Sequence, residues 1–178
     1  MRKLASLKTL EVHPRVEPPA GQVAQHFILF HGYGADAYDL QSLAEVIQTP
    51  EPTHYLFPQG PLEVPIGPGW TGRAWWNIDL AGIQAAAARG EPRDLTKESP
   101  AGVPELRRKV MEAIEALKVP WNQIILGGFS QGAMLATDIF LHAPETPKAL
   151  VVLSGALVNK EDWKTFASKR AGAPFFMC

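Results

Sequence analysis

The sequence lacks several features that mark specialised classes of protein. One cysteine, Cys178, allows no internal disulfide, which fits a reducing compartment. Lys and Arg number 17 against 18 Asp and Glu, without a basic block, so we expect no nucleic-acid partner. No segment approaches the ~18–20 apolar residues of a membrane helix, and charges interrupt the start of the chain where a signal peptide would be apolar. We therefore expect no membrane span and a cytoplasmic location.

The composition is that of an ordinary globular protein. Apolar residues make up 46% of the chain and charged residues 20%, which argues against disorder. A length of 178 residues suits one domain over 1–178. With one cysteine and no histidine pair at ligand spacing, we expect no metal and no cofactor.

Short apolar runs alternate with segments of helical periodicity. The runs are typical of strands buried on both faces and lie at 26–30, 55–57, 123–129, 149–153 and 173–178. Helices are predicted over 36–48, 78–90, 103–118, 131–142 and 160–170. Residues 58–77 hold four prolines and three tryptophans, which predicts a long irregular loop. This alternation predicts an α/β fold with a mainly parallel sheet and helices on both faces.

One motif between a predicted strand and a predicted helix carries chemistry. Residues 128–132 read Gly-Phe-Ser-Gln-Gly and fit G-x-S-x-G. A chain of this length shows that pattern by chance about once in 20, so the pattern alone is a moderate signal. The strand before it and the helix after it are what a nucleophile elbow requires. Ser130 is therefore the candidate nucleophile; the alternative is a glycine-flanked turn with a capping serine.

A second motif supplies candidate donors for an oxyanion. His-Gly-Tyr-Gly at 31–34 follows an early strand, and a tetrahedral intermediate needs two N–H donors aimed at its oxygen. In a nucleophile-elbow fold one donor follows the serine, here Gln131, and our candidate for the other is Tyr33. The alternative is a phosphate-binding loop or a plain turn. The loop lacks both the G-x-G-x-x-G spacing and the P-loop lysine, which makes phosphate binding a weak interpretation.

Taken together, several stretches resemble one known family. They lie at 30–36, 57–61, 72–79, 127–134 and 153–155, and they are similar to the phospholipase/carboxylesterase family of α/β-hydrolases, which includes acyl-protein thioesterases. The resemblance implies an α/β-hydrolase fold and a serine esterase that works through an acyl-enzyme. It also implies Ser130 as nucleophile and the backbone N–H groups of Tyr33 and Gln131 as oxyanion donors. The expected partner is a small-molecule ester, either an oxygen ester, a thioester or a lysophospholipid-type acyl ester.

The sequence departs from that family after residue 178. The family's chain order is Ser, Asp, His, and its aspartate and histidine follow the strand that resembles 173–178 and the next one. Neither has a counterpart here. We therefore expect an incomplete domain, truncated at its C-terminal strands, with an apolar strand edge open to pairing. A second polypeptide or another copy of the chain could complete the sheet.

None of the histidines present replaces the missing base convincingly. His142 lies twelve positions along the same predicted helix as Ser130, about 18 Å away, whereas a general base must be within about 3 Å. His31 could lie near Ser130, although a structural hydrogen-bonding role is favoured. The histidines that precede or begin strands are expected to be structural or exposed: His13, His26 and His54.

The tryptophans of the 58–77 segment allow two interpretations. Trp75 and Trp76, together with Trp70, could enclose an acyl or aryl group, because ligand pockets are mostly apolar. They could equally anchor the segment onto the core. Loss of the aspartate and histidine keeps a second function open: a catalytically inactive binding or regulatory protein on a hydrolase scaffold.

Overall fold

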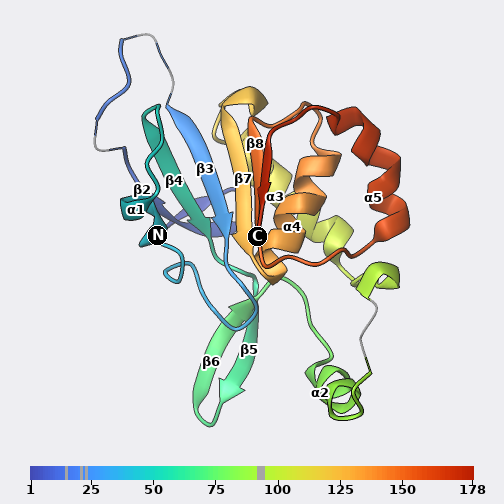
Figure 1. Ribbon diagram of the computed structural model, residues 1–178. Helices are drawn as coiled ribbons and strands as arrows, with labels where there is room; N and C mark the ends of the chain where they lie inside the picture. Colours follow the sequence, from blue (N-terminus) through green and yellow to red (C-terminus); the bar gives the residue numbers. More distant parts are fainter. Residues whose placement is uncertain (15, 21, 23, 92–94) are drawn as a thin grey trace.

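A seven-stranded sheet forms the centre of the computed structural model, which describes every residue except 15, 21, 23 and 92–94. The strand order is β1-β2-β4-β3-β7-β8-β9 (Figure 1). Strands β4, β3, β7, β8 and β9 run parallel, and β1 and β2 add an antiparallel edge. The strands span Arg2–Leu4 (β1), Leu7–Val12 (β2), Gln25–Phe30 (β3), Thr53–Pro58 (β4), Ile124–Phe129 (β7), Ala149–Leu153 (β8) and Phe175–Met177 (β9).

The longer helices gather on one face of the sheet. Figure 1 shows α3, α4 and α5 together on that face, while α1 lies on the other and α2 stands apart below. The helices span Leu43–Val46 (α1), Leu80–Ala88 (α2), Val103–Glu115 (α3), Gln131–His142 (α4) and Lys160–Ala167 (α5). Short 3₁₀ turns cover Leu95–Lys97, Trp121–Gln123 and Ser168–Arg170. Within the described residues, no helix combines the length and apolarity needed to cross a bilayer.

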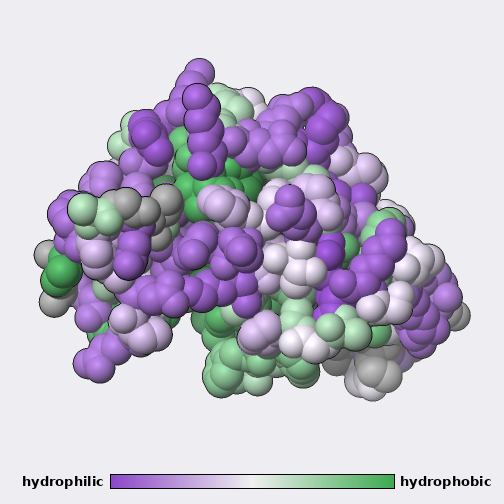
Figure 2. Space-filling view, turned by 90° about the horizontal axis from the view of Figure 1, so that it is seen from above, coloured by the Kyte–Doolittle hydropathy of each residue, from purple (hydrophilic) through white to green (hydrophobic). Residues whose placement is uncertain are grey.

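The core lies on both sides of the sheet, which explains the continuous apolar run of β3. All six β3 residues are buried, because α4 covers one face and the segment 36–47 covers the other. The larger core includes Phe30, Leu126 and Leu135, which are fully buried. Each such side chain contributes about 1.5–3 kcal/mol of burial free energy. The surface seen from above is mostly hydrophilic, with hydrophobic side chains gathered near its centre and lower edge (Figure 2).

The predicted α/β architecture is confirmed, and so are most of its elements. Helix α4 and strand β8 have the predicted bounds, and α3 carries its buried residues at helical spacing. Pro104 lies in the first turn of α3, where its missing N–H has no intrahelical acceptor.

The predicted helix over 36–48 is wrong except for its last turn. Backbone N–H groups at 39, 41, 43, 44 and 45 bond to carbonyls three residues earlier, so the segment is a series of tight turns before α1. The Ala37 N–H donates to Gln59 Oε1 at 2.6 Å, and the Tyr38 N–H donates to the Asp36 carboxylate at 2.8 Å. These local acceptors compete with a helix. The apolar residues of the segment still pack on the sheet, because tight turns also keep them on one side.

The predicted irregular loop over 58–77 is also wrong. Strands Leu62–Gly67 (β5) and Trp70–Ala74 (β6) pair as an antiparallel hairpin that extends below the sheet (Figure 1). The register shifts between Pro65 and Gly67. A two-stranded ribbon has only edge strands, where a proline need not donate, so the prolines do not prevent pairing.

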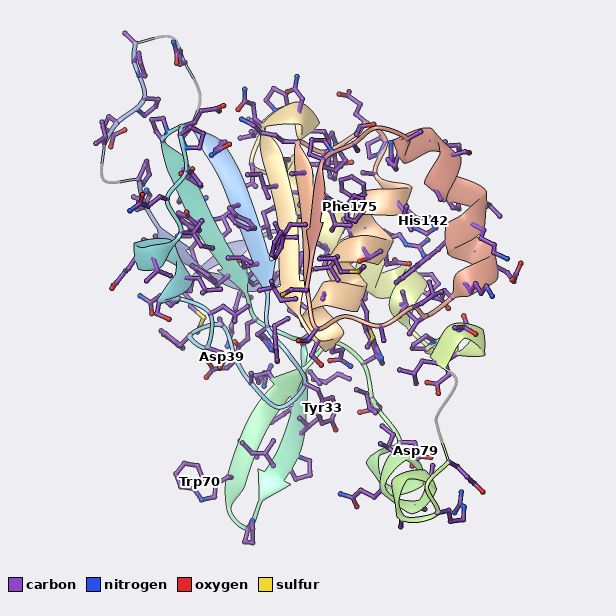
Figure 3. All side chains as sticks on the ribbon, viewed as in Figure 1. Tyr33, Asp39, Trp70, Asp79, His142 and Phe175 are labelled. Atoms are coloured by element: carbon purple, nitrogen blue, oxygen red, sulfur yellow. The ribbon has the colours of Figure 1, made fainter. Side chains whose placement is uncertain are left out.

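Strand β9 is present as predicted, but its side chains are not buried. It pairs with β8 and exposes Phe175, Phe176 and Met177 by 70%, 57% and 67%. Phe175 is labelled on this edge strand in Figure 3. Three consecutive apolar residues in a sequence do not indicate whether other elements pack on the two faces of the strand.

Candidate active site

Ser130 lies in a strained turn between β7 and α4. Its backbone has φ 51° and ψ −115°, a conformation that costs a non-glycine residue of order 1–3 kcal/mol. The Ser130 N–H donates to the carbonyl oxygen of Leu153 in β8 at 2.8 Å, which fixes the turn to the neighbouring strand. The serine is half-buried, at the edge where the parallel strands end. The turn thus has the strand–serine–helix form that the motif predicted.

The two glycines of the motif are there because the backbone approaches too closely for a side chain. A Cβ at Gly132 would lie 2.0 Å from the carbonyl oxygen of Phe30 in β3. A Cβ at Gly128 would lie 2.4 Å from the carbonyl carbon of Gly132. Both clashes involve backbone, which cannot move aside as a flexible side chain can. The start of α4 is therefore pressed against the end of β3, next to the His31–Gly34 loop.

The N–H groups of Tyr33 and Gln131 are the two candidate oxyanion donors. Within the described part of the chain, neither backbone N–H donates a hydrogen bond. Gln131 is the first residue of α4, whose aligned peptide dipoles favour negative charge at this end. Tyr33 is half-buried and lies near the base of the hairpin (Figure 3).

The loop that carries Tyr33 is held in place by β6. The Gly34 N–H donates to the carbonyl of Arg73, and the Arg73 N–H donates to the carbonyl of Ala35, both at 2.8 Å. A Cβ at Gly72 would lie 1.9 Å from the carbonyl oxygen of Gly34, so this contact also depends on a glycine. The hairpin therefore orients one of the two candidate donors.

The side chain of Gln131 makes contacts that the sequence did not reveal. It is fully buried; its Oε1 accepts from the Trp75 N–H at 2.9 Å, and its Nε2 donates to the carbonyl of Trp76 at 2.8 Å. These bonds join the residue after the nucleophile to the segment that follows β6. A glutamine on a predicted helix gives no local signal of partners 55 residues away.

His31 is a structural hydrogen-bonding residue. Its Nδ1 lies 2.8 Å from the carbonyl oxygen of Gly32, and its Nε2 accepts from the Gly60 N–H at 2.9 Å. Burial lowers the pKa of the ring, which keeps the imidazole neutral in the tautomer that these two bonds require. Both ring nitrogens are engaged, so His31 has none left for the hydroxyl of Ser130.

The tryptophans divide between the core and the tip of the hairpin. Trp75 and Trp76 are exposed by only 3% and 7%, and the Trp75 indole N–H donates to the carbonyl of His31 at 2.8 Å. Trp70, in contrast, is 72% exposed and points away from the body of the molecule (Figure 3). These contacts agree with the anchoring interpretation of Trp75 and Trp76 and place Trp70 away from the elbow.

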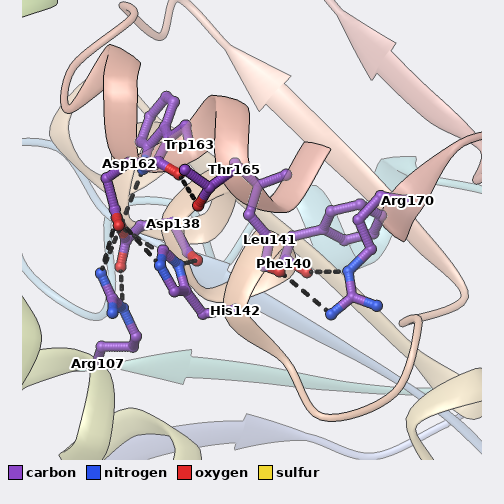
Figure 4. Close-up of polar contacts among 9 residues, drawn as sticks. All are labelled: Arg107, Asp138, Phe140, Leu141, His142, Asp162, Trp163, Thr165 and Arg170. Atoms are coloured by element: carbon purple, nitrogen blue, oxygen red, sulfur yellow. Dashed lines mark hydrogen bonds and ion pairs between the residues drawn. The ribbon is translucent and has the colours of Figure 1, made fainter. Parts of the chain in front are cut away.

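His142 belongs to a different polar cluster, drawn in Figure 4. Helix α4 is unbroken from Gln131 to His142, which confirms that this histidine is remote from Ser130. Its Nδ1 lies 2.7 Å from the carbonyl oxygen of Asp138, and its Nε2 lies 3.1 Å from the carboxylate of Asp162. Asp162 in α5 had no histidine near it in sequence, so this pairing was missed. It arises because α5 packs against α4.

Asp138 is the centre of that cluster. Its buried carboxylate accepts two hydrogen bonds from Arg107 in α3, at 2.6 and 3.0 Å, and one from the Trp163 indole in α5 at 2.9 Å. The cluster therefore ties three helices together on the face of the sheet that carries α4 (Figure 4). This is a structural role, and the carboxylate of Asp138 is held by groups of α3 and α5 rather than by a residue at Ser130.

The hydroxyl of Ser130 makes no hydrogen bond among the described residues. Of the five histidines, His31 and His142 are engaged as described, and the other three lie near the beginnings of β3 and β4, at the opposite edge of the sheet. The strand–serine–helix turn is thus present, but no histidine or carboxylate among the described residues is hydrogen-bonded to the Ser130 hydroxyl.

The fold and the elbow define an α/β-hydrolase. The family model described as Phospholipase/Carboxylesterase matches residues 11–178, and the chain therefore belongs to this family.

Individual relatives agree with the family match. The chain is 32% identical over 139 residues to acyl-protein thioesterase 1 homolog 1 of Dictyostelium discoideum, covering 73% of this chain and 56% of that protein. It is 30% identical to acyl-protein thioesterase 1 of Kluyveromyces lactis, covering 91% of this chain and 71% of that protein. The crystal structure of esterase PE8 is similar with a TM-score of 0.67 and 26% identity, covering 90% of this chain and 69% of that one. The chain thus spans little more than half the length of the Dictyostelium relative.

Proposed function

We propose that this chain carries the nucleophile and oxyanion donors of a serine hydrolase that cleaves carboxylic esters or thioesters. The observation that supports this most is the strained Ser130 between β7 and α4, together with the N–H groups of Tyr33 and Gln131, which donate no hydrogen bond within the described residues. Strain of this size is retained at functional sites because the surrounding structure enforces it. A capping serine would not need it.

The reaction runs through an acyl-enzyme. The Oγ of Ser130 attacks the acyl carbonyl carbon as a general base takes the hydroxyl proton, and the carbonyl oxygen becomes an anion facing the N–H groups of Tyr33 and Gln131. The tetrahedral intermediate collapses, and the alcohol or thiol leaves with that proton. Water then attacks the acyl-serine, the base again accepts a proton, and the free acid is released as the proton returns to Ser130.

In this proposal the general base is none of the described histidines. His31 has both nitrogens engaged, and His142 lies at the far end of α4. A histidine oriented by a carboxylate, contributed by a further segment or by another polypeptide, would complete the site. Relatives named acyl-protein thioesterases suggest thioesters and oxygen esters of fatty acids as the substrate class.

A second candidate function is a non-catalytic binding protein on the same scaffold. The observation that favours it is the absence of any hydrogen bond to the Ser130 hydroxyl within the described residues. In that case the exposed edge of β9 would be the surface that a partner protein covers.

A fluorophosphonate probe distinguishes these two functions, because it reacts with an activated serine and leaves a stable adduct. Protein isolated from its natural source should be labelled once per chain, at Ser130, and the substitution Ser130→Ala should abolish labelling. The 178-residue chain alone should react at least about a thousandfold more slowly, since loss of a triad base costs that much or more. Added imidazole should restore part of that rate. A protein from its source that resists the probe would favour the binding function.

A further inference from the structure

A cluster of histidines lies at the edge of the sheet opposite Ser130, where β3 and β4 begin. His26 and His54 are register partners in these two strands. Glu11 lies in β2, which pairs with β4, and His13 follows the end of β2. Strand pairing therefore brings together residues that are up to 43 positions apart in sequence, which is why their spacing gave no metal-ligand signal.

The ligand atoms of three of these residues are close enough to share one ion. Glu11, His13 and His54 each offer one nitrogen or oxygen, and these atoms all lie within 4.8 Å of one another. The ring centroids of His13 and His54 are 4.5 Å apart, and those of His26 and His54 are 5.0 Å apart. His13 is exposed and lines a surface groove, so an ion can reach the cluster from solvent.

One buried atom of the cluster, His54 Nε2, has no hydrogen-bond partner within the described structure. The Oε1 atom of Glu11 forms an ion pair with Nε of Arg2, whose side chain is 55% exposed, so a metal ion at Glu11 would replace a solvent-accessible guanidinium. Buried polar atoms without partners are uncommon, and an unplaced ion is one of their recognised causes.

We propose that Glu11, His13 and His54 bind a divalent transition-metal ion. Two imidazoles and a carboxylate are a ligand set typical of Zn²⁺, with the fourth tetrahedral position left for water. The ion would join the end of β2 to β4 and stabilise the antiparallel edge of the sheet. Ser130 takes no part, so this inference does not rest on the proposed hydrolase activity.

The other group of three potential ligands in the described structure provides an internal comparison. Asp138, His142 and Asp162 also have ligand atoms within 4.8 Å of one another. There, Arg107 supplies the positive charge through two hydrogen bonds to Asp138, and its side chain is only 19% exposed. A metal ion would have to displace this buried guanidinium, so we expect that group to bind none.

Zn²⁺ titration of the chain, purified without a polyhistidine tag, tests the proposal. Isothermal calorimetry should show one ion bound per chain, and Co²⁺ should give the visible absorption of a tetrahedral site. His13→Gln removes an exposed ligand with little effect on folding, and it should weaken Zn²⁺ binding by about a hundredfold or more. Loss of a residue that only supports a metal ligand already lowers metal affinity roughly 10–100-fold, and loss of a ligand itself should lower it at least as much. Asp162→Asn is the matched control, since it removes the exposed member of the other group and should leave binding unchanged.

Circular dichroism and thermal unfolding in EDTA establish that both variants are folded. The proposal is overturned if the parent chain shows no saturable binding near one ion per chain. It is equally overturned if His13→Gln binds as the parent does, or if Asp162→Asn is the variant that loses the ion.

Discussion

The backbone strain at Ser130 predicts that removing the nucleophile stabilises the protein, provided that the replacement is glycine. With φ 51° and ψ −115°, the residue occupies a region that glycine alone enters readily. Relief of the strain is worth of order 1–3 kcal/mol, and the greater chain entropy of an unfolded glycine offsets about 0.5–1 kcal/mol. The expected net gain for Ser130→Gly is therefore about 1 kcal/mol.

Ser130→Ala is the matched comparison, because alanine also lacks the hydroxyl but keeps the Cβ that causes the strain. Urea unfolding followed by tryptophan fluorescence gives the free energy of unfolding of each variant. Ser130→Gly should be about 1 kcal/mol more stable than Ser130→Ala, which corresponds to about 2–4 °C in Tm for a chain of this size. Neither variant should react with a fluorophosphonate.

The reasoning is refuted if Ser130→Gly is no more stable than Ser130→Ala. That result would mean that the turn relaxes in solution to an ordinary conformation, in which case Ser130 is a capping residue rather than a strained nucleophile.

Four further perturbations test the surroundings of the site and the rest of the fold. Gly132→Ala forces a Cβ into the backbone of β3 and should lower the free energy of unfolding, measured in urea, by about 3 kcal/mol or more. As a control, the Cβ of Gly67→Ala meets no atom within 4 Å, so that variant should differ from the parent by no more than about 0.5 kcal/mol. Gln131→Ala leaves a buried N–H and a buried carbonyl of the segment after β6 without partners, at a cost of about 3 kcal/mol. Asp138→Asn removes the carboxylate that pairs with a largely buried guanidinium and should cost about 2 kcal/mol by the same assay. The pKa of His54 is lowered to about 4 in the fold, so the unfolded chain takes up a proton at this histidine at a higher pH than the folded chain does. The free energy of unfolding, measured in EDTA, should therefore decrease as pH falls from 6.5 towards 4. The variant His54→Gln should flatten that pH dependence.

Each of these expectations has a contrary outcome. A Gly132 variant as stable as the Gly67 variant would show that α4 does not press against β3. An unchanged Gln131 variant would mean that water replaces its side-chain bonds. A stable Asp138 variant would show that the helices pack without the ion pair, and a pH dependence that survives His54→Gln would belong to other groups.

The sequence predicted the strand–serine–helix turn at Ser130 well because its determinants are local. Gly128, Ser130 and Gly132 have the spacing that a sharp strand-to-helix turn requires, and the apolar residues before and after them have the periods of a strand and a helix. The same holds for β3 and most of β7, whose apolar residues reflect a sheet covered on both faces. Strand β8 was expected to be equally buried, but its residues alternate between buried and half-buried, because its second face is only partly covered.

The errors occurred where distant partners determine the local structure. The segment 36–48 has helical periodicity, yet Gln59 captures a backbone N–H there and favours tight turns. In 58–77 the prolines and glycines indicated a loop, whereas pairing with the His31–Asp36 loop and between its own two halves produces a hairpin.

The side-chain clusters were the least predictable features. The hydrogen bonds of Gln131, the contact of His142 with Asp162 and the grouping of His13 with His54 all join segments that meet only in the folded sheet. No periodicity or spacing within one segment encodes them. Sequence reasoning therefore located Ser130 as the candidate nucleophile, but it did not find the side chains that position the segments around it.

The central claim is that the oxygen of Ser130 forms a covalent acyl intermediate. The most direct measurement incubates the protein from its source with a fatty-acyl thioester, quenches with acid and determines peptide masses. The account predicts one acyl group per chain, on the peptide that contains Ser130, and none in Ser130→Ala. Hydrolysis of the thioester without acylation of Ser130, or acylation at another residue, would contradict it.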